Sequence, residues 1–217
     1  LAKTHRVVGV ELQAHGHTFD IDRTLSFEQD ADDIAGLMKQ LEIDKANFMG
    51  FSNGGTVCLQ IGIRHSNLVN RMVLASTNFK REGMPPQFWE GMKHASLENM
   101  PQPLKDAYLK ANPDTSGLLA MFNRDKDRML SFRDISDDAI RKILVPVLVI
   151  NGDRDVVKTE HALELSRMLT NARLAILPGE HGEYIGEISS LNTDSKIPLA
   201  AITIINEFLL QTGLDSV

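Results

Sequence analysis

Residues 50–54 read Gly-Phe-Ser-Asn-Gly, a spacing that can present a serine hydroxyl for nucleophilic attack. A short apolar run precedes this stretch, and small and apolar residues follow it as far as residue 65. The pattern predicts a strand, a sharp turn with Ser52 at its apex, and a helix, as in a nucleophile elbow. Gly50 and Gly54 carry no side chain that would clash with the strained turn. We therefore predict that Ser52 is a nucleophile, the alternative being an ordinary glycine turn with a capping serine.

A serine hydroxyl needs a base to take its proton and a carboxylate to orient that base. Asp153 and Asp155 follow the apolar run at 145–150, and His181 follows the run at 173–177. Loops at the carboxyl ends of parallel strands meet at one edge of a sheet. The order serine, aspartate, histidine is also the one that accompanies such an elbow. Taken singly, the histidine also fits a surface loop and either aspartate also fits a turn.

The elements that would position these residues alternate between strands and helices. Apolar runs predict strands at 6–12, 46–51, 71–75, 145–150 and 173–177, and helical periodicity predicts helices at 26–41, 54–65, 159–169 and 198–210. This alternation predicts an α/β fold with a mostly parallel sheet flanked by helices. We expect 6–12 to be a buried strand, because it is apolar and β-branched. Ser26 with Gln29 three residues later predicts a capping box at the first helix.

Residues 79–142 have a different character, without strand-like alternation and with five of the nine methionines. We predict that they form a helical lid inserted into a core made of residues 1–78 and 143–217. Flexible methionine side chains suit an adaptable apolar surface. The candidates for lining an apolar acyl pocket are Phe88, Trp89, Met92 and Phe122. The alternative is that these residues form a small core of the insertion itself.

The overall composition argues against several classes of protein. The net charge of −6 argues against a nucleic-acid or anionic-membrane surface, which needs a basic patch. No apolar run approaches the about 20 residues of a membrane span. The single cysteine, Cys58, cannot form a disulfide within the chain, so we predict a reducing, cytoplasmic location and a thiol packed behind the elbow. We predict a small-molecule substrate as the partner, and the sequence leaves the oligomeric state open.

Several other polar residues invite a functional interpretation. His15, His17 and His65 lack the carboxylate or thiolate spacing of a metal site, so we predict neither a metal nor another cofactor. We expect His161 to be exposed at a helix start. The acidic residues of 30–33 are expected in a solvated first turn, where the helix dipole favours them.

Four stretches together resemble the α/β-hydrolase superfamily: 6–18, 48–55, 145–155 and 177–182. The resemblance implies a serine hydrolase acting through an acyl-enzyme on a small or medium acyl substrate, a carboxylic ester first. It implies Ser52 as nucleophile and His181 as base. It also implies Asp155 as the acid, since the family takes its acid from the last position of the loop Gly-Asp-Arg-Asp at 152–155. The backbone N–H of Asn53 would be an oxyanion donor.

The chain departs from the family pattern near its beginning. Family members have further strands before the one predicted at 6–12, and a loop after one of these supplies a second oxyanion N–H. His15 and Gly16 follow the wrong strand for that role. We therefore expect a further segment ahead of Leu1 in the natural protein. We expect the 217 residues alone to fold poorly or to turn over esters weakly, because a lost oxyanion donor costs about 10²–10³ in rate.

Several other functions share parts of this pattern. Hydrolases of C–C bonds, aminopeptidases of the proline-releasing kind and thioesterases use the same three side chains. A catalytically silent ligand receptor of the same fold would be marked by loss of one of them, and none is lost here. A dinucleotide-binding fold would need Gly-x-Gly-x-x-Gly after a strand, which residues 50–55 do not match.

Overall fold

The computed structural model describes residues 1–190 and 194–211, which contain a four-stranded parallel sheet. Its strands lie side by side in chain order: β1 (Ala46–Phe51), β2 (Val69–Ala75), β3 (Val147–Gly152) and β4 (Ala172–Leu177). Every neighbouring pair is parallel, as expected when helices connect successive strands. All four carboxyl ends therefore lie at one edge of the sheet, where the predicted site residues follow β1, β3 and β4.

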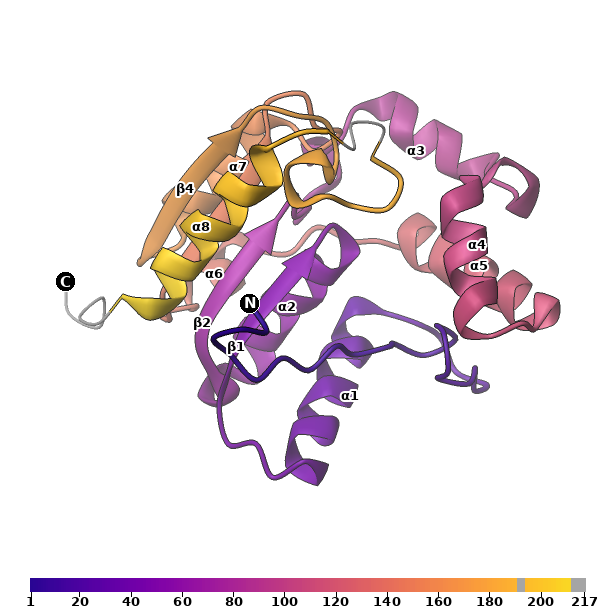
Figure 1. The fold of residues 1–217 in the computed structure, drawn as a ribbon, viewed down its shortest axis with the longest axis horizontal. Helices are drawn as coiled ribbons and strands as arrows, with labels where there is room; N and C mark the ends of the chain where they lie inside the picture. The colour runs from indigo at the N-terminus through magenta and orange to yellow at the C-terminus, as the bar shows by residue number, and fades with distance from the viewer. Residues whose placement is uncertain (191–193, 212–217) are drawn as a thin grey trace.

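Helices cover both faces of this sheet (Figure 1). The helices that flank it are α1 (Phe27–Gln40), α2 (Asn53–Arg64), α7 (Thr159–Met168) and α8 (Ile197–Leu210). Successive side chains of a strand point to opposite faces, and the core divides accordingly. Met72 and Leu74 pack with α1, α2 and α7, whereas Val73 and Ala75 pack with α8. This two-sided burial explains why residues 72–75 of β2 and 147–150 of β3 are continuously apolar in sequence.

Residues 79–142, all of which are described, contain helices and no strand. The helices are α3 (Pro86–Lys93), α4 (Gln102–Ala111), α5 (Thr115–Leu130) and α6 (Asp137–Arg141). Figure 1 shows α3, α4 and α5 to the right of the sheet, beyond α1 and α2. Short 3-10 turns complete the described elements: η1 (Ser66–Leu68), η2 (Arg81–Gly83), η3 (Leu97–Asn99) and η4 (Glu183–Ile185). The helical character of this segment agrees with the sequence prediction.

The prediction of a buried strand at 6–12 is wrong. These residues form no strand, and the side chains of Val7, Val8 and Val10 are 56%, 45% and 41% exposed. A strand needs a neighbour for its N–H and C=O groups. In the described residues β1 is an edge strand that pairs only with β2. An apolar, β-branched composition without a hydrogen-bonded partner was therefore not sufficient to form a strand.

The helix α1 begins as predicted, but its acidic residues are not simply solvated. Ser26 Oγ accepts from Gln29 N, whereas the Gln29 amide donates to Asp33, so only half of the predicted capping box forms. Asp30 is buried and accepts from Arg128 Nη1 of α5 at 2.6 Å. Burial raises the pKa of Asp30, and the nearby guanidinium opposes that rise. The expectation of a solvated acidic turn is therefore wrong at this residue.

The expectation that His161 is exposed is also wrong. Its ring is buried and stacks on Phe79 with the centroids 3.9 Å apart, and its Nε2 accepts from the Phe79 N–H at 3.2 Å. Burial lowers the pKa of His161 to about 4, so the ring is neutral near pH 7. Cys58 is buried as predicted, and desolvation raises the pKa of its thiol to about 12. Among the described helices, none has the length and apolar character needed to cross a membrane.

Candidate active site

Ser52 lies between β1 and α2 in a strained backbone conformation. Its φ of 54° and ψ of −120° are rare for a residue with a side chain, and such strain costs on the order of 1–3 kcal/mol. The Ser52 N–H donates to Ala75 O at 2.8 Å, which anchors the turn to the end of β2. Asn53 is the first residue of α2, so its backbone N–H has no acceptor within the helix. The strained turn and the free helix end lie next to each other, as in a nucleophile elbow.

The glycines around the turn differ in whether their positions have room for a side chain. A Cβ at Gly50 would lie 2.1 Å from Gly54 O, and a Cβ at Gly55 would lie 1.9 Å from Thr77 Oγ1. A Cβ at Gly54 would meet nothing within 4 Å. The close approach therefore requires Gly50 and Gly55, which corrects the argument that Gly54 is needed to avoid a clash.

His181 lies in the loop after β4 and connects the other two predicted residues. Its Nε2 is 3.1 Å from Ser52 Oγ, and its Nδ1 is 2.8 Å from Asp155 Oδ1. An ionised carboxylate only accepts hydrogen bonds, so Nδ1 carries the proton and Nε2 presents a lone pair to the serine hydroxyl. The Phe51 ring packs against the imidazole with centroids 4.7 Å apart. The ring is thus oriented for accepting the proton of Ser52.

Asp155 is held by the loop that follows β3, and its side chain is fully buried. Besides His181, its Oδ1 accepts from the Val157 N–H at 2.9 Å. The amide of the buried Asn151 donates to Val157 O at 2.8 Å and to Gly152 O at 2.9 Å, which fixes the loop. The carboxylate therefore has a defined orientation before any substrate arrives.

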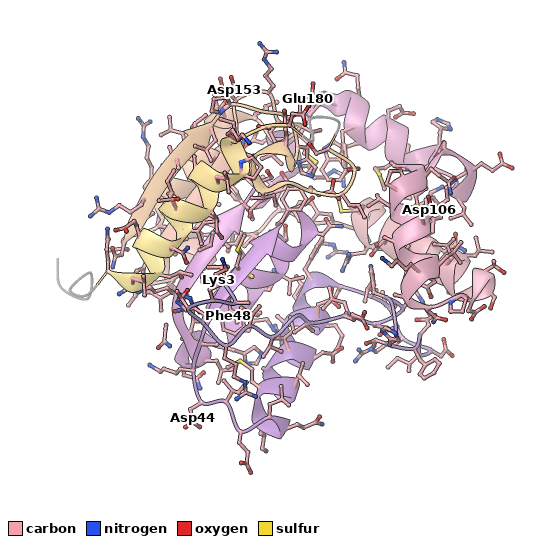
Figure 2. The ribbon with its side chains drawn as sticks, in the orientation of Figure 1. Lys3, Asp44, Phe48, Asp106, Asp153 and Glu180 are labelled. Carbon is pink, nitrogen blue, oxygen red and sulfur yellow. The ribbon has the colours of Figure 1, made fainter. Side chains whose placement is uncertain are left out.

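Asp153, the other candidate acid, has a structural contact. Its Oδ1 accepts from the Gly179 N–H at 2.8 Å, which ties the loop after β3 to the loop after β4. These loops approach so closely that a Cβ at Gly152 would lie 2.3 Å from Gly179 O. Figure 2 shows Asp153 and Glu180 at the same end of the molecule, opposite Asp44, which precedes β1. The structure thus brings Asp155, and not Asp153, to His181.

Two hydroxyl groups at this site were missed in the sequence analysis. Ser76 Oγ donates to Asp155 Oδ2 at 2.5 Å and lies 2.6 Å from Tyr184 OH. Burial raises the pKa of Tyr184, while the Ser76 hydrogen bond opposes this rise and the Asp155 charge adds to it. Ser76 directly follows β2, so the rule that selected residues at strand ends would have found it. Tyr184, in η4, has no comparable sequence signal.

The predicted pocket residues lie mostly within packed helices. Trp89 is buried, donates from Nε1 to Arg81 O at 2.8 Å, and stacks on Phe132. Phe88 and Met92 are partly buried against the same apolar cluster, and Phe122 on α5 is half-buried. For the first three residues, these contacts favour the alternative that they form a core of the helical segment.

His15, His17 and His65, for which the sequence predicts no metal, each contact a carboxylate. Nε2 of His15 lies 3.1 Å from Asp125, and Nε2 of His65 lies 2.7 Å from Asp32. Across residues 1–190 and 194–211, no group of three or more His, Cys, Asp or Glu side chains is arranged to hold a metal ion.

The family model of the alpha/beta hydrolase fold matches residues 1–130, more than half of the chain, so this protein belongs to that family. Human serine hydrolase BPHL is 25% identical over 195 residues, which cover 84% of this chain and 65% of that protein. The chain therefore spans slightly less than two thirds of this relative. The 2-hydroxymuconate semialdehyde hydrolase of Pseudomonas sp. (strain CF600) is 26% identical over 205 residues, covering 85% of this chain and 72% of that protein.

The same fold is found among solved structures. The enol-lactonase from Burkholderia xenovorans LB400 matches with a TM-score of 0.68 and 24% identity, covering 92% of this chain and 79% of that chain. Sequence and structural relatives therefore agree on the α/β-hydrolase fold, and the named relatives by sequence are hydrolases.

Proposed function

We propose that this protein is a serine hydrolase that cleaves small or medium acyl substrates, with carboxylic esters as the first class. The observation that carries the proposal is the pair of consecutive hydrogen bonds that connects Ser52 to His181 and His181 to Asp155. A serine of ordinary reactivity would not need a strained backbone, an imidazole lone pair and a buried carboxylate in series.

In the proposed reaction, Ser52 Oγ attacks the acyl carbonyl carbon while its proton passes to His181 Nε2. The Asn53 N–H and the N-terminus of α2 stabilise the negative charge that develops on the carbonyl oxygen. His181 then returns the proton to the leaving alcohol oxygen as the ester bond breaks, leaving the acyl group on Ser52. A water molecule, deprotonated by the same imidazole, releases the acid and restores the serine. Asp155 stabilises the imidazolium throughout.

The division into a core at 1–78 and 143–217 and a lid at 79–142 is part of this proposal. The all-helical content of the inserted segment supports it. Of the four predicted pocket residues, we retain Phe122 as the foremost candidate, because it is half-buried and stands apart from the tightly packed cluster around Trp89.

The test is hydrolysis of p-nitrophenyl esters of increasing acyl length by the unchanged chain and by Ser52→Ala. We expect the variant to lose ester turnover while keeping its circular dichroism spectrum. Ser166→Ala is the matched control, because the Ser166 hydroxyl donates to Leu163 O within α7. Unchanged turnover by Ser52→Ala would exclude Ser52 as the nucleophile.

A C–C bond hydrolase is the second candidate, favoured by the similarity to 2-hydroxymuconate semialdehyde hydrolase. The same three side chains would serve it, so only the substrate separates the two proposals. Comparing consumption of that semialdehyde with hydrolysis of p-nitrophenyl acetate decides between them. A large preference for the semialdehyde would replace the ester assignment.

A further inference from the structure

Behind Asp155 lies a pair of hydroxyl groups that the three-residue mechanism does not use. Ser76 and Tyr184 are both completely buried. Ser76 has a φ of 47°, a conformation that is uncommon for a residue other than glycine, and its N–H donates to Ile150 O at 2.9 Å. The backbone therefore turns sharply at the end of β2 and presents the serine side chain to the acid.

The direction of each hydrogen bond follows from the number of protons available. Asp155 Oδ2 accepts, so Ser76 must donate its only hydroxyl proton to it. The 2.6 Å contact between Ser76 Oγ and Tyr184 OH then requires the tyrosine to donate to the serine. Ile150 O, at 3.4 Å, is the more distant acceptor for Tyr184. The protons are therefore ordered from Tyr184 through Ser76 to the carboxylate.

We propose that Ser76 and Tyr184 are positioning residues of the hydrolase, which set the orientation and charge of Asp155 and act on His181 through it. This inference rests on the proposed function. Tyr184 lies three residues after His181 and packs among apolar residues of β2, β3 and α8. The tyrosine therefore also fixes the loop that carries the histidine, so both partners of the Asp155–His181 contact depend on one buried anchor.

Loss of the Ser76 hydroxyl should have two consequences. The carboxylate loses one donor and keeps more of its negative charge, so it stabilises the charged form of the imidazole more strongly, and the labelling of Ser52 should require a higher pH. The carboxylate also loses one of its fixed contacts, and the misplacement of the base lowers kcat. The other charged or titratable groups on the two loops are Asp153, Arg154, Lys158, Glu180, Glu183 and Glu187. Asp153 Oδ1 and Glu183 Oε2 accept from backbone N–H groups there.

The experiment measures the pH dependence of serine phosphonylation by a fluorophosphonate, together with ester kcat and KM. The variants are Ser76→Ala, Tyr184→Phe and the double variant. In the pH profile of labelling, the acidic limb is the range in which the rate falls as the pH is lowered. We expect Ser76→Ala to shift this limb to higher pH by about 0.5–1 pH unit. We also expect it to lower kcat about 10-fold with little change in KM. Tyr184→Phe keeps the packing of the ring and removes only the hydroxyl, which reaches Asp155 through Ser76, so it should move the limb in the same direction by less. The double variant should show the same shift and the same kcat as Ser76→Ala, since the Tyr184 hydroxyl acts on Asp155 through Ser76.

The chain offers a matched control, because Tyr108 is its only other tyrosine and is buried among the helices of residues 79–142. Tyr108→Phe should leave the acidic limb in place. If Ser52→Ala blocks labelling but the limb stays unmoved in Ser76→Ala, the positioning role is wrong and the hydrolase proposal stands. If the shifts of the two single variants add in the double variant, the claim that Tyr184 acts through Ser76 is wrong. If the unchanged chain is not labelled at all, both proposals fail.

Discussion

Two buried aspartates show how differently this molecule handles a carboxylate. Asp155 is held by an imidazole, a serine hydroxyl and a backbone N–H, which are all fixed polar groups. Asp30 faces the guanidinium of Arg128, and within the described residues its Oδ1 has no hydrogen-bond partner. The first carboxylate is oriented toward a group that can exchange a proton, whereas the second is neutralised by a permanent cation.

The comparison teaches that burial of a carboxylate does not by itself indicate chemistry. Asp30 lies on α1 and Arg128 on α5, so this pair joins the sheet-flanking helices to the segment at 79–142. Arg128 also donates to Asp125 at 2.7 Å. We interpret this pair as a structural connection and the Asp155 cluster as a reactive one, and substitutions at the two positions should separate rate from stability.

The largest expected effect is on the rate of Asp155→Asn. An amide in place of the carboxylate removes the charge that stabilises the imidazolium and favours the wrong tautomer of His181, so we expect kcat for p-nitrophenyl acetate to fall by about 10⁴-fold. The melting temperature should change far less, because the amide keeps the size of the carboxyl. A variant that retains more than a tenth of the activity would remove Asp155 from the mechanism.

The second expected effect is on the stability of Asp30→Ala. Removing Asp30 leaves the buried Arg128 guanidinium with Asp125 as its remaining carboxylate partner, so we expect a loss of about 3 kcal/mol, at the low end for breaking a buried ion pair. For a chain of this size the melting temperature should fall by roughly 10 °C. Measured well below the melting temperature, kcat should stay within about twofold of the unchanged chain. Equal losses of rate and stability would break the distinction between the two aspartates.

Asp32→Ala is the matched control on the same helix, because Asp32 is partly exposed and pairs with Arg64. We expect its free energy of unfolding to fall by less than about 1 kcal/mol at pH 7. Hydrogen bonds from Arg64 and then from His65 lower the pKa of Asp32 to about 2, below its unfolded value. This small contribution is therefore present above pH ~4 and is lost as the pH falls through the folded-state pKa. Chemical denaturation at pH 7 and near pH 2 measures the difference.

The parts of the fold that could be predicted are those fixed by local sequence. The elbow, the strand at 46–51 and the helix at 54–65 follow from the spacing of glycine and apolar residues, and the structure has β1 and α2 there. The meeting of His181 with Asp155 follows from their positions after parallel strands. Ser76 shares that position and was missed only because the strand-end rule was not applied to β2.

Most of the failures concern contacts made by distant segments. Residues 6–12 have the composition of a strand, but strand formation depends on a neighbour that local sequence does not specify. The burial of Asp30 and of His161 depends on Arg128 and Phe79 respectively, which come from other parts of the chain. Tyr184 reaches Ser76 only because η4 folds against β2 and β3. Such contacts are properties of the tertiary structure and leave no periodic signal.

The central claim is that His181 activates Ser52, and peptide mapping after treatment with a fluorophosphonate tests it most directly. The account predicts a single phosphonyl adduct on the peptide that contains Ser52, formed at least about 10²-fold more slowly in His181→Ala. An adduct on another residue, or an equal rate of labelling in the histidine variant, would contradict it.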